Sequence, residues 1–128
     1  MTSIQRCVQL LQTGQVDKAV SGLSQLLKIN AKDIESHQLI GVCYIMLSEY
    51  KLAEKHLLKA LKLNPEHIDA QYNLARLYSE LQKFSKAKTL LLSVLKKRPT
   101  WLQARFALGL SAVGLNGTQV ARTAFKKY

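Results

Sequence analysis

Three histidines and two cysteines are the residues of this 128-residue chain best suited to bind a metal ion or to act as nucleophiles. His37, His56 and His67 are too far apart in the sequence to form the closely spaced pair that a metal site on one helix needs. We therefore expect each histidine to be a partly exposed helix or turn residue, and we assign no metal or other cofactor.

Cys7 and Cys43 lack the C-x-x-C spacing, and we expect them to be free thiols that pack in the interior of a protein kept in a reducing compartment. A disulfide or a nucleophilic thiol is the alternative. No glycine-rich run followed by lysine is present to hold a phosphate, and nothing in the spacing groups serine, histidine and acidic residues into a triad. The sequence therefore predicts that the chain by itself is not an enzyme.

The strongest pattern in the chain is a repeat with a period of 34 residues, and this period determines the predicted fold. It is carried by evenly spaced alanines, by large apolar residues four positions later, and by small residues in the other half of each unit: Ala19, Ala53, Ala87 and Ala121; Leu23, Leu57, Leu91 and Phe125; Cys7, Gly41, Ala75 and Gly109. Apolar residues at three- and four-residue steps indicate two amphipathic helices per unit. Because small residues let two helix axes approach closely, each unit is predicted to be a helical hairpin.

These columns resemble the tetratricopeptide repeat over nearly the whole chain. The match rests on Gly41, Tyr44, Ala53, Ala60 and Pro65 in the second unit, on Leu74, Tyr78, Ala87 and Pro99 in the third, and on Leu108, Gly109, Ala121 and Phe125 in the fourth. The first unit departs from the family pattern at Arg6 and Thr13, as caps often do, and His37, Gln71 and Arg105 stand where a bulky residue is common. The resemblance implies an all-α, right-handed α-solenoid of four helix-turn-helix repeats, with about eight antiparallel helices.

We expect one domain with repeats at about 1–33, 34–67, 68–101 and 102–128, because a hairpin of this size buries too little surface to fold alone. Turns are predicted at three asparagines and three glycines: Asn30, Asn64, Asn116, Gly14, Gly114 and Gly117. Asp33 and Ser85 are predicted to cap helices.

The resemblance implies that the first helices of the repeats line a concave groove, which we expect to bind a peptide or a helical segment of a partner protein. The residues assigned to this groove are Gln38, Val42, Ile45, Tyr72, Asn73, Arg76, Phe106 and Leu110. Tyr72 and Phe106 are the expected anchors, and Asn73 and Arg76 would supply hydrogen bonds. Any one apolar residue of the set could instead belong to the core. An apolar strip that persists through consecutive repeats nevertheless favours a binding site.

Family members that hold the terminal carboxylates of chaperones use lysine, asparagine and arginine side chains on three successive first helices. The corresponding positions here carry Ile4, Val8, Leu39, Asp69 and Asn73, or, one repeat later, Gln38, Val42, Asn73, Gln103 and Ala107. Only Asn73 in the later register matches, and a groove without the cations cannot hold two carboxylates by charge-assisted hydrogen bonds. We therefore do not expect the chain to bind chaperone tails.

The formal net charge of +11 comes largely from lysines on the predicted second helices, which face the convex side of this architecture. The candidates for a basic convex patch are Lys51, Lys55, Lys59, Lys86 and Lys88. We interpret the patch as a solvated face, and the alternative is a surface for nucleic acid, acidic lipid or an acidic partner. Nucleic acid is the less favoured partner, because aromatic residues are not interleaved with the lysines as base stacking would need.

The last predicted helix presents an apolar face without a polar capping helix after it, at Val120, Ala121, Ala124, Phe125 and Tyr128. We expect a second copy or a further domain to cover this end. The alternative function is therefore a regulatory or substrate-presenting module of a larger enzyme, such as a transferase, of which the chain would be a fragment. No apolar run approaches the roughly 20 residues of a membrane span, and no secretion signal is seen, so we expect a cytoplasmic protein.

Overall fold

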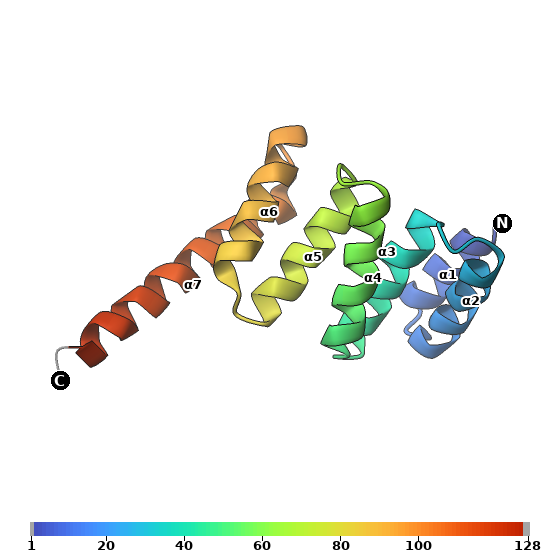
Figure 1. Ribbon diagram of the computed structural model, residues 1–128, viewed down its shortest axis with the longest axis horizontal. Coiled ribbons are helices and arrows are strands. Elements are labelled where there is room, and N and C mark those ends of the chain that lie inside the picture. Colours follow the sequence, from blue (N-terminus) through green and yellow to red (C-terminus); the bar gives the residue numbers. More distant parts are fainter. Residues whose placement is uncertain (1, 127–128) are drawn as a thin grey trace. The chain divides into compact units, whose positions relative to one another are not determined.

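The computed structural model describes the backbone of residues 2–126 and the side chains of residues 2–115. Within this range the chain forms seven α-helices and no strand (Figure 1). The helices are α1 (Ser3–Gln12), α2 (Val16–Ile29), α3 (Ile34–Met46), α4 (Tyr50–Leu63), α5 (Ile68–Glu80), α6 (Phe84–Lys97) and α7 (Leu102–Lys126). The predicted all-helical class is confirmed. The chain divides into two compact units, Met1–Asn73 and Leu74–Tyr128, which are described separately below.

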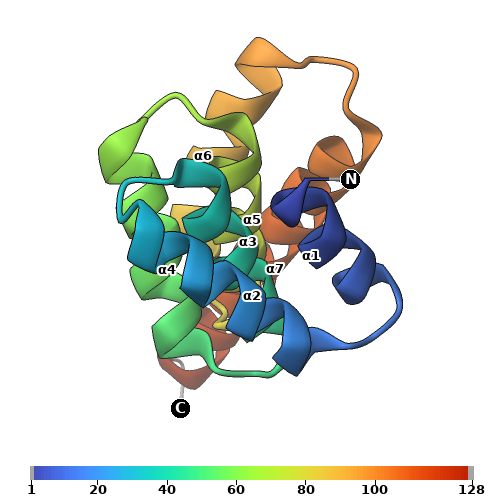
Figure 2. The ribbon, with the colours of Figure 1, turned by 90° about the vertical axis from the view of Figure 1, so that its right-hand side faces the viewer.

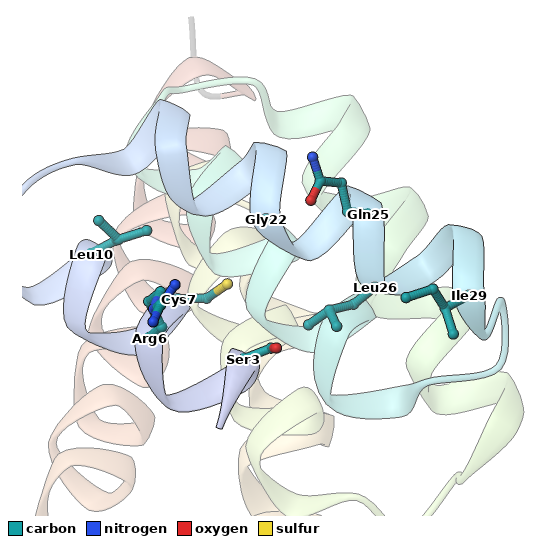
Figure 3. Close-up of a pocket in the computed structure, with 8 residues that line it drawn as sticks. All are labelled: Ser3, Arg6, Cys7, Leu10, Gly22, Gln25, Leu26 and Ile29. Atoms are coloured by element: carbon teal, nitrogen blue, oxygen red, sulfur yellow. The ribbon is translucent and has the colours of Figure 1, made fainter. Parts of the chain in front are cut away.

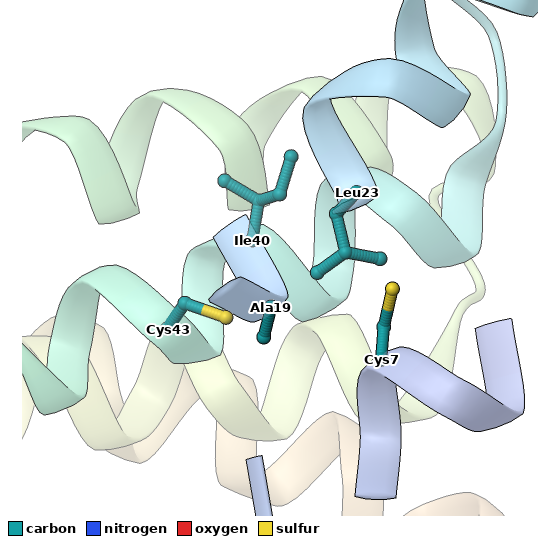
Figure 4. Packing of buried hydrophobic residues seen from close by; sticks show 5 residues of the cluster. All are labelled: Cys7, Ala19, Leu23, Ile40 and Cys43. Carbon is teal, nitrogen blue, oxygen red and sulfur yellow. The ribbon is translucent and has the colours of Figure 1, made fainter. Parts of the chain in front are cut away.

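Unit 1 is built from α1 to α4 and the start of α5, with α1 packed on α2, α2 on α3, and α3 on α4. Figure 2 shows α1 and α2 side by side. Its core contains five buried residues from the first three helices: Cys7, Ala19, Leu23, Ile40 and Cys43 (Figure 4). The small alanine column and the leucine four residues later thus bring α2 against α3, as the repeat pattern predicts.

Both cysteines are buried free thiols, as predicted. Burial raises the pKa of Cys7, and it raises the pKa of Cys43 to about 11. Because the thiolate is the reactive form of cysteine, both side chains are held in their unreactive state at neutral pH. They act here as small apolar packing residues.

The turn inside each of the first three repeats uses one residue with positive φ. These residues are Gly14, Ser48 and Gln82, with φ values of 81°, 59° and 59°, and they occupy equivalent places in successive repeats. The backbone N–H of the following residue then donates to a carbonyl of the preceding helix, as from Glu49 to Tyr44 at 2.8 Å. Only Gly14 was predicted to lie at a turn, because serine and glutamine do not mark the left-handed region in a sequence.

The turns between repeats are organised by asparagine, as predicted. Asn30 and Asn64 cap the ends of α2 and α4, and their side-chain oxygens accept from the N–H groups of Lys32 and Glu66, each at 3.1 Å. Asp33 caps α3 by accepting from the N–H of Ser36. The predicted cap at Ser85 is wrong, because α6 begins one residue earlier, at Phe84.

Unit 2 contains the end of α5 together with α6 and α7, and α6 packs on α7. Ala87, Leu91 and Val94 of α6 are fully buried, and so are Ala104 and Ser111 of α7. The ring of Phe84 lies against Gly114, where a Cβ atom would be only 2.7 Å from the ring. Gly114 therefore has no room for a side chain.

The expectation of eight helices is wrong, because α7 runs without a break over 25 residues. Asn116 occupies the position at which Gly14, Ser48 and Gln82 turn the chain, yet the helix continues through it, and Gly114 and Gly117 lie inside the helix. Continued hydrogen bonding along the helix replaces the fourth chain reversal. The predicted apolar face of residues 120–128 lies outside the side chains that the structure describes.

Candidate functional site

The predicted groove residues of unit 1 differ in how far they reach solvent. Gln38 on α3 and Asn73 on α5 are buried, and each residue is 6% exposed. Val42, Ile45 and Tyr72 are half-buried. The apolar members of this set are therefore the accessible ones in unit 1, and the two amides contribute to its interior.

The predicted groove residues of unit 2 are all exposed. On α7, Phe106 and Leu110 are 70% and 55% exposed, and they continue a row with two neighbours at helical spacing. We call this row the α7 stripe: Leu102, Phe106, Leu110 and Val113. Steps of four, four and three residues place these side chains on one face of the helix. Arg76 on α5 is also exposed, and Leu102 is a member of the stripe that was not assigned to the groove from the sequence.

The five candidate lysines of the basic patch are exposed on second helices, with Lys51, Lys55 and Lys59 on α4 and the other two on α6. The three on α4 follow one another at four-residue steps, so their like charges repel by a few tenths of a kcal/mol per pair. In unit 2 the Lys86 ammonium lies 5.4 Å from the centre of the Tyr78 ring, a cation–π contact. The four-residue spacing therefore places the three α4 lysines on one face of that helix.

The expectation that each histidine is partly exposed is wrong for His37, which is buried, and is confirmed for His56 and His67. His37 is only 7% exposed, and its Nδ1 lies 3.1 Å from Nδ1 of His56 because α3 and α4 pack antiparallel. Nε2 of His37 lies 2.8 Å from the carbonyl oxygen of Ala31 and must donate to it. Neutral His37 then accepts at Nδ1, which assigns the donor role to His56.

The surroundings of His56 disfavour its charged form. Burial, followed by the nearby His37 and Lys55, lowers the pKa of His56. The ring of Tyr44 is stacked on His56, with ring centres 5.8 Å apart. This cluster braces the α3–α4 hairpin in its neutral state.

The third histidine has a separate structural role. Nε2 of His67 lies 2.7 Å from a carboxylate oxygen of Glu35, and its Nδ1 accepts from the N–H of Ala70 in the first turn of α5. Among the residues described, no group of three histidine, cysteine or acidic side chains is placed to hold a metal ion. The histidines therefore fasten helices and turns.

One arrangement explains a departure from the family pattern. His37 and Gln71 stand at equivalent positions where a bulky residue is common, and each is 7% exposed. Gln71 donates to the carbonyl of Pro65 at 2.9 Å, as His37 does to Ala31. Both side chains thus tie the start of a first helix to the turn before it.

Unit 1 also has a cavity of about 260 Å³ between α1 and α2 that sequence analysis did not predict (Figure 3). Its lining combines apolar residues with one cation: Ser3, Arg6, Cys7, Leu10, Gly22, Gln25, Leu26 and Ile29. Ile29 is 84% exposed, although it is a large apolar side chain. The sequence feature that could have indicated this cavity is Arg6, which stands where the family pattern has an apolar residue.

Helix pairs that recur with a fixed period, and that carry exposed apolar and basic faces, define an α-helical repeat protein. The profile of the tetratricopeptide repeat family matches residues 44–109, slightly more than half of the chain. The chain belongs to this family, which confirms the resemblance.

Solved structures of the same fold agree with this assignment. The NMR structure of the first TPR domain of human RPAP3 is 19% identical, with a TM-score of 0.86, and the match covers 91% of this chain and 92% of that one. The first TPR of Spaghetti (RPAP3) bound to the HSP90 peptide SRMEEVD is 19% identical, with a TM-score of 0.85 and coverages of 89% and 93%. A crystal structure of MamA is 22% identical, with a TM-score of 0.80 and coverages of 98% and 68%.

The chain spans 65% of the length of another similar structure, the MamA RS-1 ArsTM double mutant. A comparison with curated protein sequences finds no match. No helix in the described part of the chain combines the length and hydrophobicity needed to cross a membrane.

Proposed function

We propose that the chain is a protein-interaction scaffold whose first helices bind a peptide or a helical segment of a partner. The α7 stripe carries this proposal, because four large apolar side chains on one helix face are each more than half exposed. Contiguous exposed apolar residues of this kind usually mark binding surfaces. The TPR domain of RPAP3 that binds an HSP90 peptide has the same fold, which supports peptide binding as the mode of action.

In this proposal the repeats at about 1–33, 34–67 and 68–101 and the single helix that follows them form a right-handed solenoid, and the first helices carry the groove residues. Val42, Ile45, Tyr72, Phe106 and Leu110 provide apolar contact, and Arg76 meets an acidic group of the partner. Gln38 and Asn73 are buried, so their role is to fix the helices that present the others.

The chain acts by binding and has no catalytic role in this proposal. Its thiols are buried and held in the protonated form, and its histidines are engaged with Ala31, Glu35 and one another. Attachment to a larger enzyme as a presenting module remains the alternative, with the same surface as the working part. We place the protein in the cytoplasm.

The test is affinity capture from a native lysate, read by mass spectrometry, with the double variant Phe106→Ala and Leu110→Ala. Both side chains are largely exposed, so the helical content should be unchanged while the amount of captured partner falls at least about tenfold. The matched control is Leu92→Ala, which shortens a side chain that is 51% exposed on a different helix, α6. Equal capture by the double variant and the control would contradict the proposal.

The basic patch supports a second candidate, binding to an acidic surface, because all five of its lysines are exposed. Such binding depends on charge, so it should weaken steeply as the salt concentration rises. Measuring capture at low and at high salt separates the two candidates, since apolar contact in the groove responds little to salt. Flat salt dependence would remove the second candidate.

A further inference from the structure

We propose that the cavity between α1 and α2 is a docking site for an acidic amphipathic helix of a partner protein. Ser3, Arg6, Gln25 and Ile29 of its lining are exposed, so the cavity opens to solvent. Its volume of about 260 Å³ lies below the usual range of small-molecule pockets, about 300–1,000 Å³. It therefore suits one or two side chains of a docked segment. None of the lining residues belongs to the proposed groove, so this site is independent of it.

The repeat itself shows what kind of element covers such a face. The residue equivalent to Arg6 in the next repeat is Ile40, which is 1% exposed and shares a buried cluster with Ala19 and Leu23 of α2 (Figure 4). The face of α3 that corresponds to the open face of α1 is therefore covered by a helix. That helix presents an alanine and, four residues later, a leucine. A helix of similar shape fits the open face of α1.

Arg6 determines the charge of the occupant. If a helix like α2 covered this face unchanged, its leucine would bury the Arg6 guanidinium without a partner, which is strongly unfavourable. A carboxylate at the position of that leucine would instead form a charge-assisted hydrogen bond with Arg6. The occupant therefore carries an acidic residue opposite Arg6 and apolar residues opposite Leu10, Leu26 and Ile29.

The net charge selects between a foreign partner and a second copy. At +11, two copies of this chain repel each other, whereas an acidic helix is attracted. Gly22 lies against Cys7, where a Cβ atom would be only 2.9 Å from the sulfur, so the missing side chain lets α2 approach α1 closely at this cavity. The site thus combines apolar walls, a small residue and one cation.

Two synthetic peptides test the site. The first has the sequence of residues 16–29, which covers the equivalent face of α3 in this protein, and the second carries Leu23→Glu within that sequence. Both are acetylated, amidated and held helical by a hydrocarbon staple on the face away from the contact, because short isolated helices are marginal. Fluorescence anisotropy with the full chain should show about tenfold tighter binding of the glutamate peptide.

The variant Arg6→Ile restores the residue type found at Ile40 and should reverse the preference, so that the unchanged peptide binds more tightly. Arg6 is exposed, and circular dichroism should show that the variant folds normally. Ile29→Ser should weaken both peptides, whereas Leu58→Ser, which alters a side chain that is 46% exposed on α4, should weaken neither.

Equal affinity of the two peptides for the unmodified chain, or the same order of affinity after Arg6→Ile, would overturn the proposal. Self-association of the chain that Ile29→Ser abolishes would also overturn it, because the occupant would then be a second copy. Binding of the glutamate peptide should be unchanged by Phe106→Ala and Leu110→Ala. A failure at this site is therefore distinguishable from a failure of the proposed groove.

Discussion

Gly41 in the α3–α4 hairpin and Gly109 in the first half of α7 occupy equivalent positions of the repeat, but they differ in what covers them. A Cβ atom at Gly41 of α3 would lie 2.6 Å from Cγ of Leu57, whereas a Cβ atom at Gly109 of α7 would meet nothing within 4 Å. The difference arises because α4 folds back on α3, while α7 continues as one helix. A small residue thus permits close packing of two helices but does not enforce it.

The residues beside these glycines show the same contrast. His37 and Tyr44, on either side of Gly41, are buried or half-buried against His56 of α4. Arg105 occupies the position equivalent to His37 and is exposed. A face of α3 that is core in a closed hairpin is solvent-facing on α7.

The largest expected effect comes from removing the side chain that closes the α3–α4 hairpin. Leu57 is fully buried, so Leu57→Ala should lower the free energy of unfolding by about 3 kcal/mol through lost burial and a cavity. Urea denaturation followed by circular dichroism measures this loss. A cost below about 1 kcal/mol would mean that the contact between Leu57 and Gly41 is not a close one.

Adding a methyl group to the other side of the same contact should cost less. Gly41→Ala places a Cβ atom where Leu57 lies and should cost about 1–2 kcal/mol, despite the better helix propensity of alanine. In a chain that already carries Leu57→Ala, this cost should disappear. Strict additivity of the two changes in urea denaturation would show that the residues do not touch.

Acid should lower the stability of the α3–α4 hairpin because it protonates His56. Its folded pKa is lowered from the ordinary value of 6.5, so the unfolded chain binds the proton more readily. The contribution of neutral His56 to stability is complete above about pH 6.5 and is lost as the pH falls below it toward the folded pKa. His56→Gln keeps a donor for His37 but cannot titrate, so its stability should fall less than that of the unmodified chain between about pH 7 and about pH 5. Parallel pH profiles would contradict this role.

The smallest expected effect has the opposite sign. Gly109→Ala should raise the stability of the chain by about 0.5–1 kcal/mol, because the site is open and alanine favours the helix. Thermal unfolding of the two alanine variants compares Gly109 directly with Gly41. A cost at Gly109 as large as that at Gly41 would mean that a second helix covers α7 in solution, and the contrast between the two regions would vanish.

The fixed period of the repeat was enough to predict the first six helices, because each apolar column requires a partner helix to bury it. The structure confirms the predicted turns at Asn30 and Asn64 and the predicted cap at Asp33. At each of them a side-chain oxygen accepts a hydrogen bond from a backbone N–H group. The predicted turn at Asn116 is wrong, because an asparagine tolerates the turn conformation without requiring it. Residue type alone could not decide whether the chain reverses there.

The candidate sites were predictable only in part. The spacing of Phe106 and Leu110 placed them on one helix face, but their exposure depends on the absence of a covering helix on that face of α7 among the described residues. His37 and His56 lie on different helices, so no local sequence motif indicates that they are in contact. The cavity at Arg6 likewise needs the packing of α1 on α2 to exist.

The two buried thiols give unit 1 an internal reporter of its own opening. Cys7 sits on α1 and Cys43 on α3, and both are almost completely shielded from solvent. An alkylating reagent can reach them only when the surrounding helices separate, so the labelling rate measures that fluctuation. If Cys7 is labelled well before Cys43, the first helix detaches while the rest of the unit stays closed.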